Sequence, residues 1–177
     1  MIFTPTPIPG AFVIELEKRE DERGFFARAW CQREFAAHGL NPSIAQVNIS
    51  YNRHKHTLRG LHFQADPHGE DKLLRCTAGA LHFVLVDLRR ESPAYKTNIA
   101  VSLTATNYRM LYVPKGCANG FLTLADDSEV LYLISQFYEP GAERGIKWND
   151  PALGVEWPIA EPAVLSEKDR NWPDFAG

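Results

Sequence analysis

The sequence has 177 residues, 45% of them hydrophobic and 23% charged, a balance typical of one globular domain with a sizeable core. The net charge of −3 gives no electrostatic basis for binding nucleic acid, and no apolar run approaches the ~20 residues needed to cross a membrane. The N-terminal segment MIFTPTPIPG does not have the pattern of a signal peptide, and three cysteines without metal-type spacing (Cys31, Cys76 and Cys117) indicate reduced thiols in a cytoplasmic protein.

Short segments rich in Val, Ile, Leu, Phe, Tyr and Thr alternate with turn residues, which predicts many short β-strands. In chain order, the predicted strands are Ala11–Leu16, Phe25–Trp30, Ile44–Tyr51, Leu58–Gln64, Lys72–Thr77, Ala80–Asp87, Asn98–Leu103, Arg109–Val113, Gly120–Leu124 and Glu129–Phe137. A helix is expected over Gln32–His38, closed by Gly39, and Ser166 is expected to cap a second helical turn. No linker or internal repeat divides the chain, so we predict one all-β domain over residues 1–177, an antiparallel jelly roll with one or two short helices.

The segment TLRGLHFQ, from Thr57 to Gln64, reads as a strand although it contains arginine, glycine and histidine. Strict alternation places Gly60 and His62 on one face and Arg59 on the other. Gly60 predicts a bulge, or a point where something approaches the backbone closely. A single histidine in a strand is more often a core residue than a site residue, so His62 alone predicts no chemistry.

Two further segments carry groups that could exchange protons or hold charge. EVLYLISQFY, residues 129–138, places Tyr132 and Tyr138 on one strand face, where phenols can line a pocket or simply be buried. Lys72 begins an apolar strand, and Asp169 lies in a predicted turn far from it in sequence. A carboxylate beside a histidine would fix its tautomer, but spacing alone does not join Asp169 to His62.

A metal site is the alternative for the histidines. His54, His56 and His62 lie close together, and cupin-type barrels often bind metal through histidines. However, no suitably placed glutamate and distal histidine follow the HKH segment, and His54 and His56 fit a solvated loop. We therefore predict no metal.

Nine segments together resemble the dTDP-4-dehydrorhamnose 3,5-epimerase family, in family order and over nearly the whole chain. They are DERGFF (Asp21–Phe26), QVNIS (Gln46–Ser50), TLRGLHFQ (Thr57–Gln64), DKLLR (Asp71–Arg75), VDLRRESP (Val86–Pro93), VPKGCANGF (Val113–Phe121), EVLYLISQFYEP (Glu129–Pro140), ERGIKWNDP (Glu143–Pro151) and LSEKDR (Leu165–Arg170). The resemblance implies a double-stranded β-helix of the cupin-like jelly-roll class, a homodimer, and catalysis without metal or cofactor. It also implies a nucleotide-diphosphate 4-keto-6-deoxyhexose as substrate, in deoxysugar and polysaccharide biosynthesis.

The resemblance further implies a role for each matching position. His62 would be the base with Asp169 as its partner, Tyr132 the acid on the opposite face of the sugar, and Lys72 the group that stabilises the enolate. The implied substrate-binding residues are Arg23, Phe26, Arg28, Gln46, Asn48, Arg59, Asn119, Tyr138, Glu143 and Lys168. These groups suit the reaction, because removing a proton beside the C4 ketone leaves an enolate, which needs a base, a positive charge and an opposed acid.

Three positions depart from the family pattern. Asn119 and Phe83 stand where histidine and aspartate are usual, and we expect this pair to lie together near the sugar and to affect whether C3 is inverted. Arg28 stands where glutamate is usual. Arginine only donates hydrogen bonds, which suits the acceptors of cytosine and favours CDP over dTDP, unless Arg28 pairs with a neighbouring acid or faces solvent.

Several functions therefore remain open. The leading prediction is an isomerase that inverts C3 and C5 of a dTDP-linked 4-keto sugar. The alternatives are a C5-only or C3-only epimerase of a CDP-linked sugar, a 3,4-ketoisomerase, and a non-catalytic module that binds sugar nucleotides.

Overall fold

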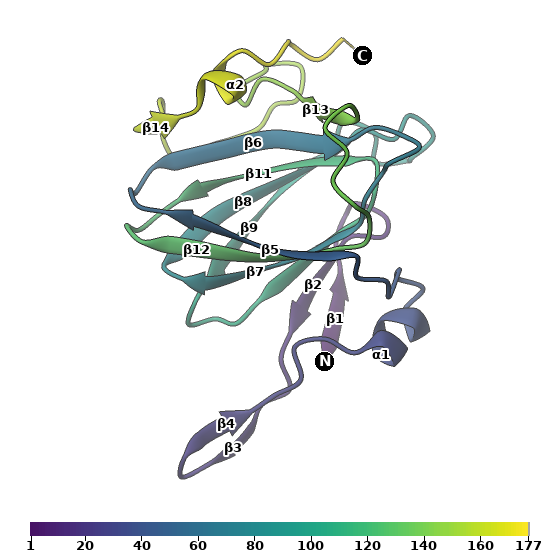
Figure 1. The fold of residues 1–177 in the computed structure, drawn as a ribbon, viewed down its shortest axis with the longest axis vertical. Helices are drawn as coiled ribbons and strands as arrows, with labels where there is room; N and C mark the ends of the chain where they lie inside the picture. The colour runs from purple at the N-terminus through teal and green to yellow at the C-terminus, as the bar shows by residue number, and fades with distance from the viewer. Residues whose placement is uncertain (177) are drawn as a thin grey trace.

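Two sheets pack face to face and enclose the core of the computed structural model, which describes residues 1–176 (Figure 1). The first sheet has the strand order β1-β2-β10-β7-β12-β5 and is antiparallel throughout. Its strands are β1 (Ile2–Pro5), β2 (Phe12–Glu15), β5 (Gln46–Asn52), β7 (Lys72–Ala78), β10 (Met110–Val113) and β12 (Ser128–Ile134).

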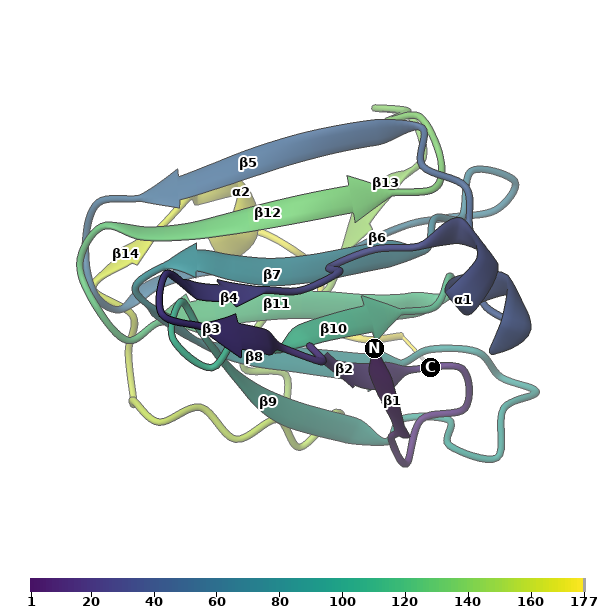
Figure 2. The same ribbon diagram turned by 90° about the horizontal axis from the view of Figure 1, so that it is seen from below.

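The second sheet has the order β13-β6-β11-β8-β9, and a short strand, β14, joins β6 in parallel. Its strands are β6 (Thr57–Gln64), β8 (Ala80–Asp87), β9 (Asn98–Thr104), β11 (Cys117–Thr123), β13 (Glu143–Gly145) and β14 (Val164–Leu165). Figure 2 shows the strands of the two sheets crossing the molecule in similar directions. The parallel pairing of β14 departs from the predicted antiparallel arrangement, whereas the predicted jelly-roll class is confirmed.

Alternation along β8 shows how the core is built. Phe83 and Leu85 point into the central cluster between the sheets, while Val84 and Val86 lie in a second cluster on the outer face. Ile146, from the chain that follows β13, packs in that outer cluster. Because β8 is covered on both faces, it reads as a continuous apolar run.

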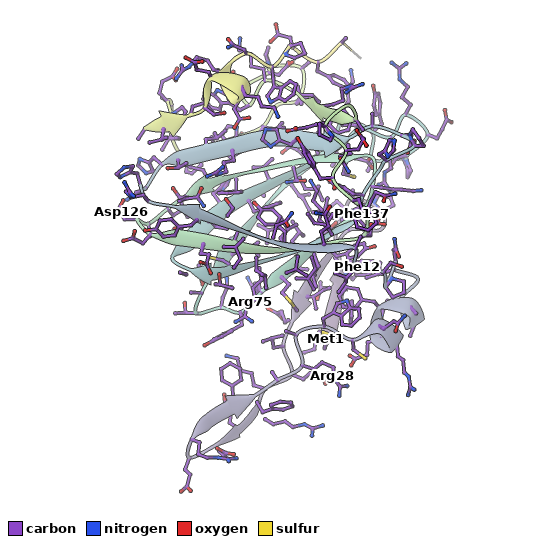
Figure 3. The ribbon with its side chains drawn as sticks, in the orientation of Figure 1. Met1, Phe12, Arg28, Arg75, Asp126 and Phe137 are labelled. Carbon is purple, nitrogen blue, oxygen red and sulfur yellow. The ribbon has the colours of Figure 1, made fainter. Side chains whose placement is uncertain are left out.

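A hairpin of β3 (Arg19–Asp21) and β4 (Gly24–Phe26) extends away from the two sheets as an arm (Figures 1 and 3). Phe26, which pairs with Arg19 on the side of the hairpin away from its turn, is 72% exposed. At the base of the arm, the Lys18 ammonium lies 4.7 Å from the ring centre of Phe25 and 4.6 Å from that of Tyr108. The arm is therefore tethered to the body by few contacts.

Residues 1–176 also include two short helices. Helix α1 spans Gln32–Ala37, and α2 spans Glu167–Arg170. Ser166 caps α2 by accepting a 3.0 Å hydrogen bond from the backbone nitrogen of Asp169, as predicted. Neither helix has the length and apolar character needed to cross a bilayer.

The predicted strands match the structure except near the arm. The strand predicted over Phe25–Trp30 is wrong, because β4 ends at Phe26 and pairs only with β3. Strands β1, β3, β13 and β14 were not predicted; each has four residues or fewer, too short to show a period. The other nine predicted strands are confirmed, with ends shifted by no more than three residues, and Ala80–Asp87 has both predicted ends.

Candidate active site

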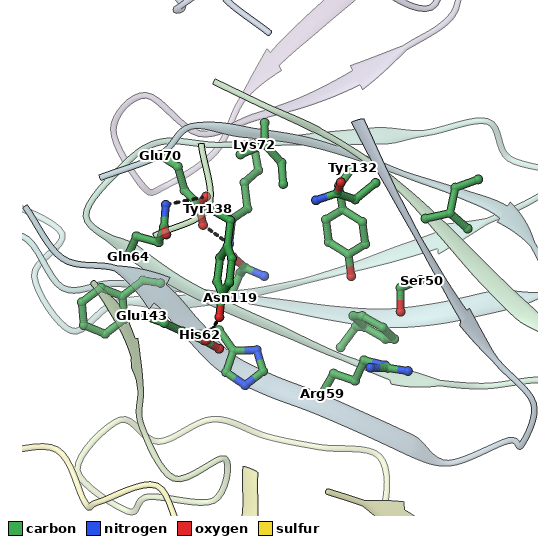
Figure 4. Close-up of a pocket in the computed structure, with 15 residues that line it drawn as sticks. Ser50, Arg59, His62, Gln64, Glu70, Lys72, Asn119, Tyr132, Tyr138 and Glu143 are labelled. Atoms are coloured by element: carbon green, nitrogen blue, oxygen red, sulfur yellow. Dashed lines mark hydrogen bonds and ion pairs between the residues drawn. The ribbon is translucent and has the colours of Figure 1, made fainter. Parts of the chain in front are cut away.

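A cavity of about 290 Å³ opens between the two sheets, with walls from β5, β6, β7, β11 and β12 (Figure 4). The predicted site residues that line it are Asn48, Arg59, His62, Lys72, Asn119, Tyr132, Tyr138 and Glu143. Residues up to 95 positions apart in sequence thus meet in one cavity, whose lining combines polar and apolar side chains.

The β6 strand turns both Arg59 and His62 into this cavity, although strict alternation predicted them on opposite faces. The prediction was wrong because the pairing of β6 with β11 shifts register between Asn119 and Phe121. Gly60 lies at the shift with φ of +128°, and a Cβ there would lie 2.5 Å from Cα of Gly120. The predicted bulge and close backbone approach at Gly60 are both confirmed.

The His62 imidazole is held by a buried carboxylate. Nε2 of His62 lies 2.5 Å from Oδ1 of Asp169, which also accepts a 3.3 Å hydrogen bond from Nε1 of Trp172. Burial by itself would raise the pKa of Asp169, but the hydrogen bonds from His62 and Trp172 hold that pKa below its usual value. Asp169 is therefore ionised and accepts a hydrogen bond from Nε2 of His62, which turns Nδ1, the other ring nitrogen, away from the carboxylate.

Tyr132 reaches the cavity from β12, on the sheet that faces β6. Burial raises the pKa of Tyr132 well above its usual value, although the charge of Arg59 acts in the opposite direction. The phenol is therefore protonated at neutral pH and can donate. Ser50, in the same wall and not predicted, has a buried Oγ beside the Tyr132 phenol, and this contact lowers the pKa of Tyr132, in opposition to burial.

The Lys72 ammonium is buried and shared by two acceptors. Nζ of Lys72 lies 3.0 Å from Oδ1 of Asn119 and 2.9 Å from Oε1 of Glu70. Glu70 was not predicted, because no periodicity indicates that an acid in the loop before β7 turns inward. Gln64, which donates a 3.1 Å hydrogen bond to Oε2 of Glu70, was visible in the TLRGLHFQ segment but not assigned to the site.

Arg59 carries a charge with no carboxylate partner among the described residues. Its Nε donates a 2.7 Å hydrogen bond to Oδ1 of Asn52, and one terminal nitrogen lies 3.5 Å from the carbonyl oxygen of Tyr51. The guanidinium is thus oriented by neutral groups, which leaves its positive charge available to an anionic ligand.

The other predicted binding residues contact one another at the rim of the cavity. The backbone nitrogen of Tyr138 donates a 2.5 Å hydrogen bond to Oε1 of Gln46, and its hydroxyl donates to Glu143. Nζ of Lys168 lies 2.6 Å from Oε2 of Glu143. Because Lys168 precedes Asp169 on α2, this ion pair ties the helix that carries the carboxylate to the cavity rim.

Asp169, Gln46 and Lys168 contact residues that line the cavity, whereas three other predicted residues lie on the arm or at its base, away from it. Arg23 pairs with Asp21 at 2.6 Å within the arm, and Phe26 lies exposed near its base. Arg28 lies where the arm meets the body (Figure 3), with a terminal nitrogen 3.2 Å from Oε1 of Glu34. The structure of the single chain thus places these residues on the arm, outside the lining of the cavity.

Phe83 and Asn119 were predicted to lie together beside the sugar, but Phe83 does not line the cavity. Phe83 is fully buried and stacks on Phe121, with ring centres 6.3 Å apart. Phe121 lines the cavity and Phe83 lies behind it, so only Asn119 of the two departures lines the cavity. No cluster of three or more His, Cys, Asp or Glu side chains within residues 1–176 is arranged to hold a metal ion.

Comparison with known proteins agrees with this arrangement. The family model for dTDP-4-dehydrorhamnose 3,5-epimerase matches residues 5–177. The dTDP-4-dehydrorhamnose 3,5-epimerase of Salmonella typhimurium is 41% identical over 174 residues, which cover 98% of this chain and 94% of the relative.

Solved structures agree as well. The Bacillus anthracis dTDP-4-dehydrorhamnose 3,5-epimerase, with TDP and PPi bound, superposes with a TM-score of 0.94 at 37% identity over 98% of this chain and 99% of that one. A 3'-monoepimerase from Streptomyces bikiniensis in complex with dTDP-quinovose has a TM-score of 0.88 at 34% identity, over 96% of this chain and 86% of that one. This chain belongs to the dTDP-4-dehydrorhamnose 3,5-epimerase family.

Proposed function

We propose that this protein is an isomerase of the dTDP-4-dehydrorhamnose 3,5-epimerase type, acting on a nucleotide-diphosphate 4-keto-6-deoxyhexose. The observation that carries the proposal is the placement of three groups around one cavity. The imidazole of His62 and the phenol of Tyr132 come from the two facing sheets, and the ammonium of Lys72 lies in the same chamber. Inversion of a carbon needs a proton acceptor and a proton donor on opposite sides, beside a group that holds negative charge.

The proposed reaction begins at His62. Nδ1 takes the proton from the carbon beside the C4 ketone, and Asp169 stabilises the resulting imidazolium through Nε2. The electron pair of the broken C–H bond moves onto the ketone oxygen, and Lys72 stabilises that enolate. Tyr132 then donates its proton to the same carbon from the other side, which inverts the centre.

Binding of the substrate follows from the remaining side chains. We assign the diphosphate to Arg59, whose charge no carboxylate in the described chain neutralises. Asn48 and Asn119 offer neutral hydrogen bonds to the sugar from β5 and β11. Gln46, Tyr138, Glu143 and Lys168 would form the mouth through which the nucleotide extends.

The active assembly is proposed to be a homodimer. Val47, Ile49 and Tyr51 alternate along edge strand β5 and are 56%, 64% and 52% exposed. An exposed apolar row on an edge strand, beside an arm with an exposed phenylalanine, is typical of a surface covered by another chain. In this dimer, the arm of one subunit would bring Arg23, Phe26 and Arg28 to the cavity of the other.

Inversion at a single carbon is the second candidate function. It is favoured by Asn119, an amide that cannot act as an acid or base, in contact with Lys72. The similarity to a 3'-monoepimerase is compatible with this outcome.

The nucleotide is proposed to be dTDP, in line with the TDP and dTDP-quinovose bound to the similar structures. Arg28 is the residue that argues for CDP, because its guanidinium offers donors only. Its ion pair with Glu34 provides it with a carboxylate inside the same chain, which weakens that argument.

Incubation with dTDP- and CDP-4-keto-6-deoxyglucose in heavy water tests the proposal. We expect deuterium at C3 and C5, inverted configuration, and faster turnover of the dTDP sugar; label and inversion at one carbon would select the single-carbon function. A product with its ketone at C3 would identify a ketoisomerase instead. Complete absence of exchange at both carbons would leave only a binding module.

A further inference from the structure

A buried carboxylate that the reaction does not use directly stands behind Lys72. The side chain of Glu70 is only 9% exposed, yet it lies in the wall of the cavity beside a lysine that is 11% exposed (Figure 4). Its two oxygens have different partners: Oε1 lies 2.9 Å from Nζ of Lys72, and Oε2 accepts a 3.1 Å hydrogen bond from Nε2 of Gln64. A carboxylate so far from water is stable only when both oxygens are satisfied.

Gln64 cannot reorient to serve another partner. Its Nε2 also lies within hydrogen-bond distance of the carbonyl oxygens of His68, at 3.1 Å, and Phe137, at 3.2 Å. Its Oε1 accepts a 2.7 Å hydrogen bond from the backbone nitrogen of Glu139. The amide is therefore held by two loops at the cavity rim, and it fixes the Glu70 carboxylate in turn.

The ammonium of Lys72 has three N–H donors. Glu70 and Asn119 accept two of them, and no other acceptor in the described chain takes the third. Because Nζ lies in the wall of the cavity, that remaining donor is available to a ligand. Two fixed acceptors define where the third N–H points, as a long flexible lysine alone would not.

We propose that Glu70 is a positioning residue, which holds the Lys72 ammonium so that its free N–H meets the ketone oxygen of the substrate. This inference rests on the proposed function for the identity of that oxygen. The Glu70 carboxylate also places a negative charge 2.9 Å from Nζ of the buried Lys72, whether or not an anionic substrate is present.

Glu70→Gln is the sharpest variant, because it keeps the shape and removes one acceptor. A glutamine at this position must turn its NH2 group toward either the Lys72 ammonium or the Gln64 amide, and both are donors. We expect kcat to fall by about 10- to 100-fold, the scale of a displaced catalytic group, with KM changed less than threefold. The affinity for dTDP, which has no ketone, should stay the same.

Glu70→Asp keeps the charge and should recover part of the lost kcat. Glu139→Gln is the matched control, since it removes an exposed carboxylate from the neighbouring loop without touching Lys72. A kcat within threefold of the parent in Glu70→Gln would overturn the proposal, as would equal losses in Glu70→Gln and Glu139→Gln.

A spectroscopic measurement separates this inference from the proposed function. In protein labelled with 15N-lysine, an ammonium held by two acceptors should give a cross-peak for Lys72 that is protected from exchange with water. We expect that cross-peak to broaden or vanish in Glu70→Gln, and an unchanged cross-peak would overturn the positioning role. If the parent inverted no sugar at all, the proposed function would fail, while this signal would still decide whether Glu70 holds the lysine.

Discussion

In the proposed reaction, His62 removes the proton and Tyr132 donates one from the other side. Variants of the two residues should therefore affect proton exchange and inversion differently. His62→Ala should abolish solvent exchange at both carbons, because no base remains. Tyr132→Phe removes only the proposed donor, so exchange through His62 should continue while net inversion slows by about 10²- to 10⁴-fold, the range for general acid catalysis. Proton NMR in heavy water measures both quantities, and fast inversion by Tyr132→Phe would show that another residue is the acid.

Asp169 links the same site to the stability of the fold. Its pKa is lower in the folded chain than the ~3.9 of a free aspartate, so ionisation of this group stabilises the folded state above that pH. The contribution should be lost as the pH falls through the lower folded pKa. In Asp169→Asn, the partners His62 and Trp172 lose a charged acceptor, and we expect the free energy of unfolding at pH 7 to fall by about 1–3 kcal/mol.

Urea unfolding of the parent and Asp169→Asn between pH 3 and 7 provides the measurement. The difference between the two proteins should shrink toward acid pH, because protonation of Asp169 in the parent removes the interaction that the variant already lacks. A difference that stays constant over this range would contradict the assigned direction of the pKa shift.

At the scale of single residues, the sequence indicated which side chains could act in the site, but not which of them contact one another. Tyr132 and Lys72 were noted individually, and only the family resemblance joined His62 to Asp169, because 107 residues separate them. Glu70 was missed for a different reason: acids in loops are usually solvated, and what turns this one inward is the fixed amide of Gln64, a tertiary contact.

At the scale of the element, the β6–β11 pairing depends on the absence of side chains at Gly60. Gly60 and Gly24 have nearly the same positive φ, +128° and +125°. A Cβ at Gly60 would lie 2.5 Å from Cα of Gly120, whereas a Cβ at Gly24 meets nothing within 4 Å. Alanine at Gly24 therefore measures conformational strain alone, and alanine at Gly60 measures strain plus collision.

We expect Gly24→Ala to cost about 1–2 kcal/mol of unfolding free energy, the cost of an unfavourable φ. Gly60→Ala should cost more than Gly24→Ala and should also lower kcat, because separating β6 from β11 moves Arg59 and His62 together. Chemical denaturation and steady-state kinetics of the two variants test this. Equal destabilisation of both would mean that β11 moves aside without cost.

The bulge at Gly60 also explains why alternation predicted the facing of side chains correctly on one strand and wrongly on another. Alternation placed Tyr132 and Tyr138 together, and both line the cavity, although β12 ends at Ile134 and Tyr138 lies in the loop beyond it. It failed on β6, where a register shift lets Arg59 and His62 share a face. Gly60 signalled that an irregularity was present, but its effect on the neighbouring side chains depends on the partner strand, which the local sequence does not specify.

At the scale of the whole molecule, the least predictable feature is the arm. Its residues were predicted to bind substrate and to form part of a longer strand, but β3 and β4 pair only with each other. The sequence does not indicate that this hairpin extends away from the two sheets. Its pattern of apolar and polar residues would be the same whether the hairpin packed on its own chain or on another subunit. The distance of the arm from its own cavity makes sense if each active site is built from two chains.

Mixing two defective variants tests this arrangement directly. His62→Ala has an intact arm but no base, and Arg23→Ala has an intact base but a weakened arm. If the arm serves the partner's cavity, a mixed dimer contains one complete site, formed by the cavity of the Arg23→Ala chain and the arm of the His62→Ala chain. Random exchange makes about half of the dimers mixed, so we expect about a quarter of the parent activity to return in the mixture.

The control uses the exposed row on β5. Val47→Arg, added to the His62→Ala chain, places a charge on the surface proposed to be covered, and it should prevent both association and recovery. Ile2→Arg, at the opposite edge of the same sheet and 51% exposed, should leave recovery intact. Sedimentation velocity reports association in each mixture. Mixed dimers without recovered activity would show that each arm serves its own chain, and a monomeric parent would remove the shared site altogether.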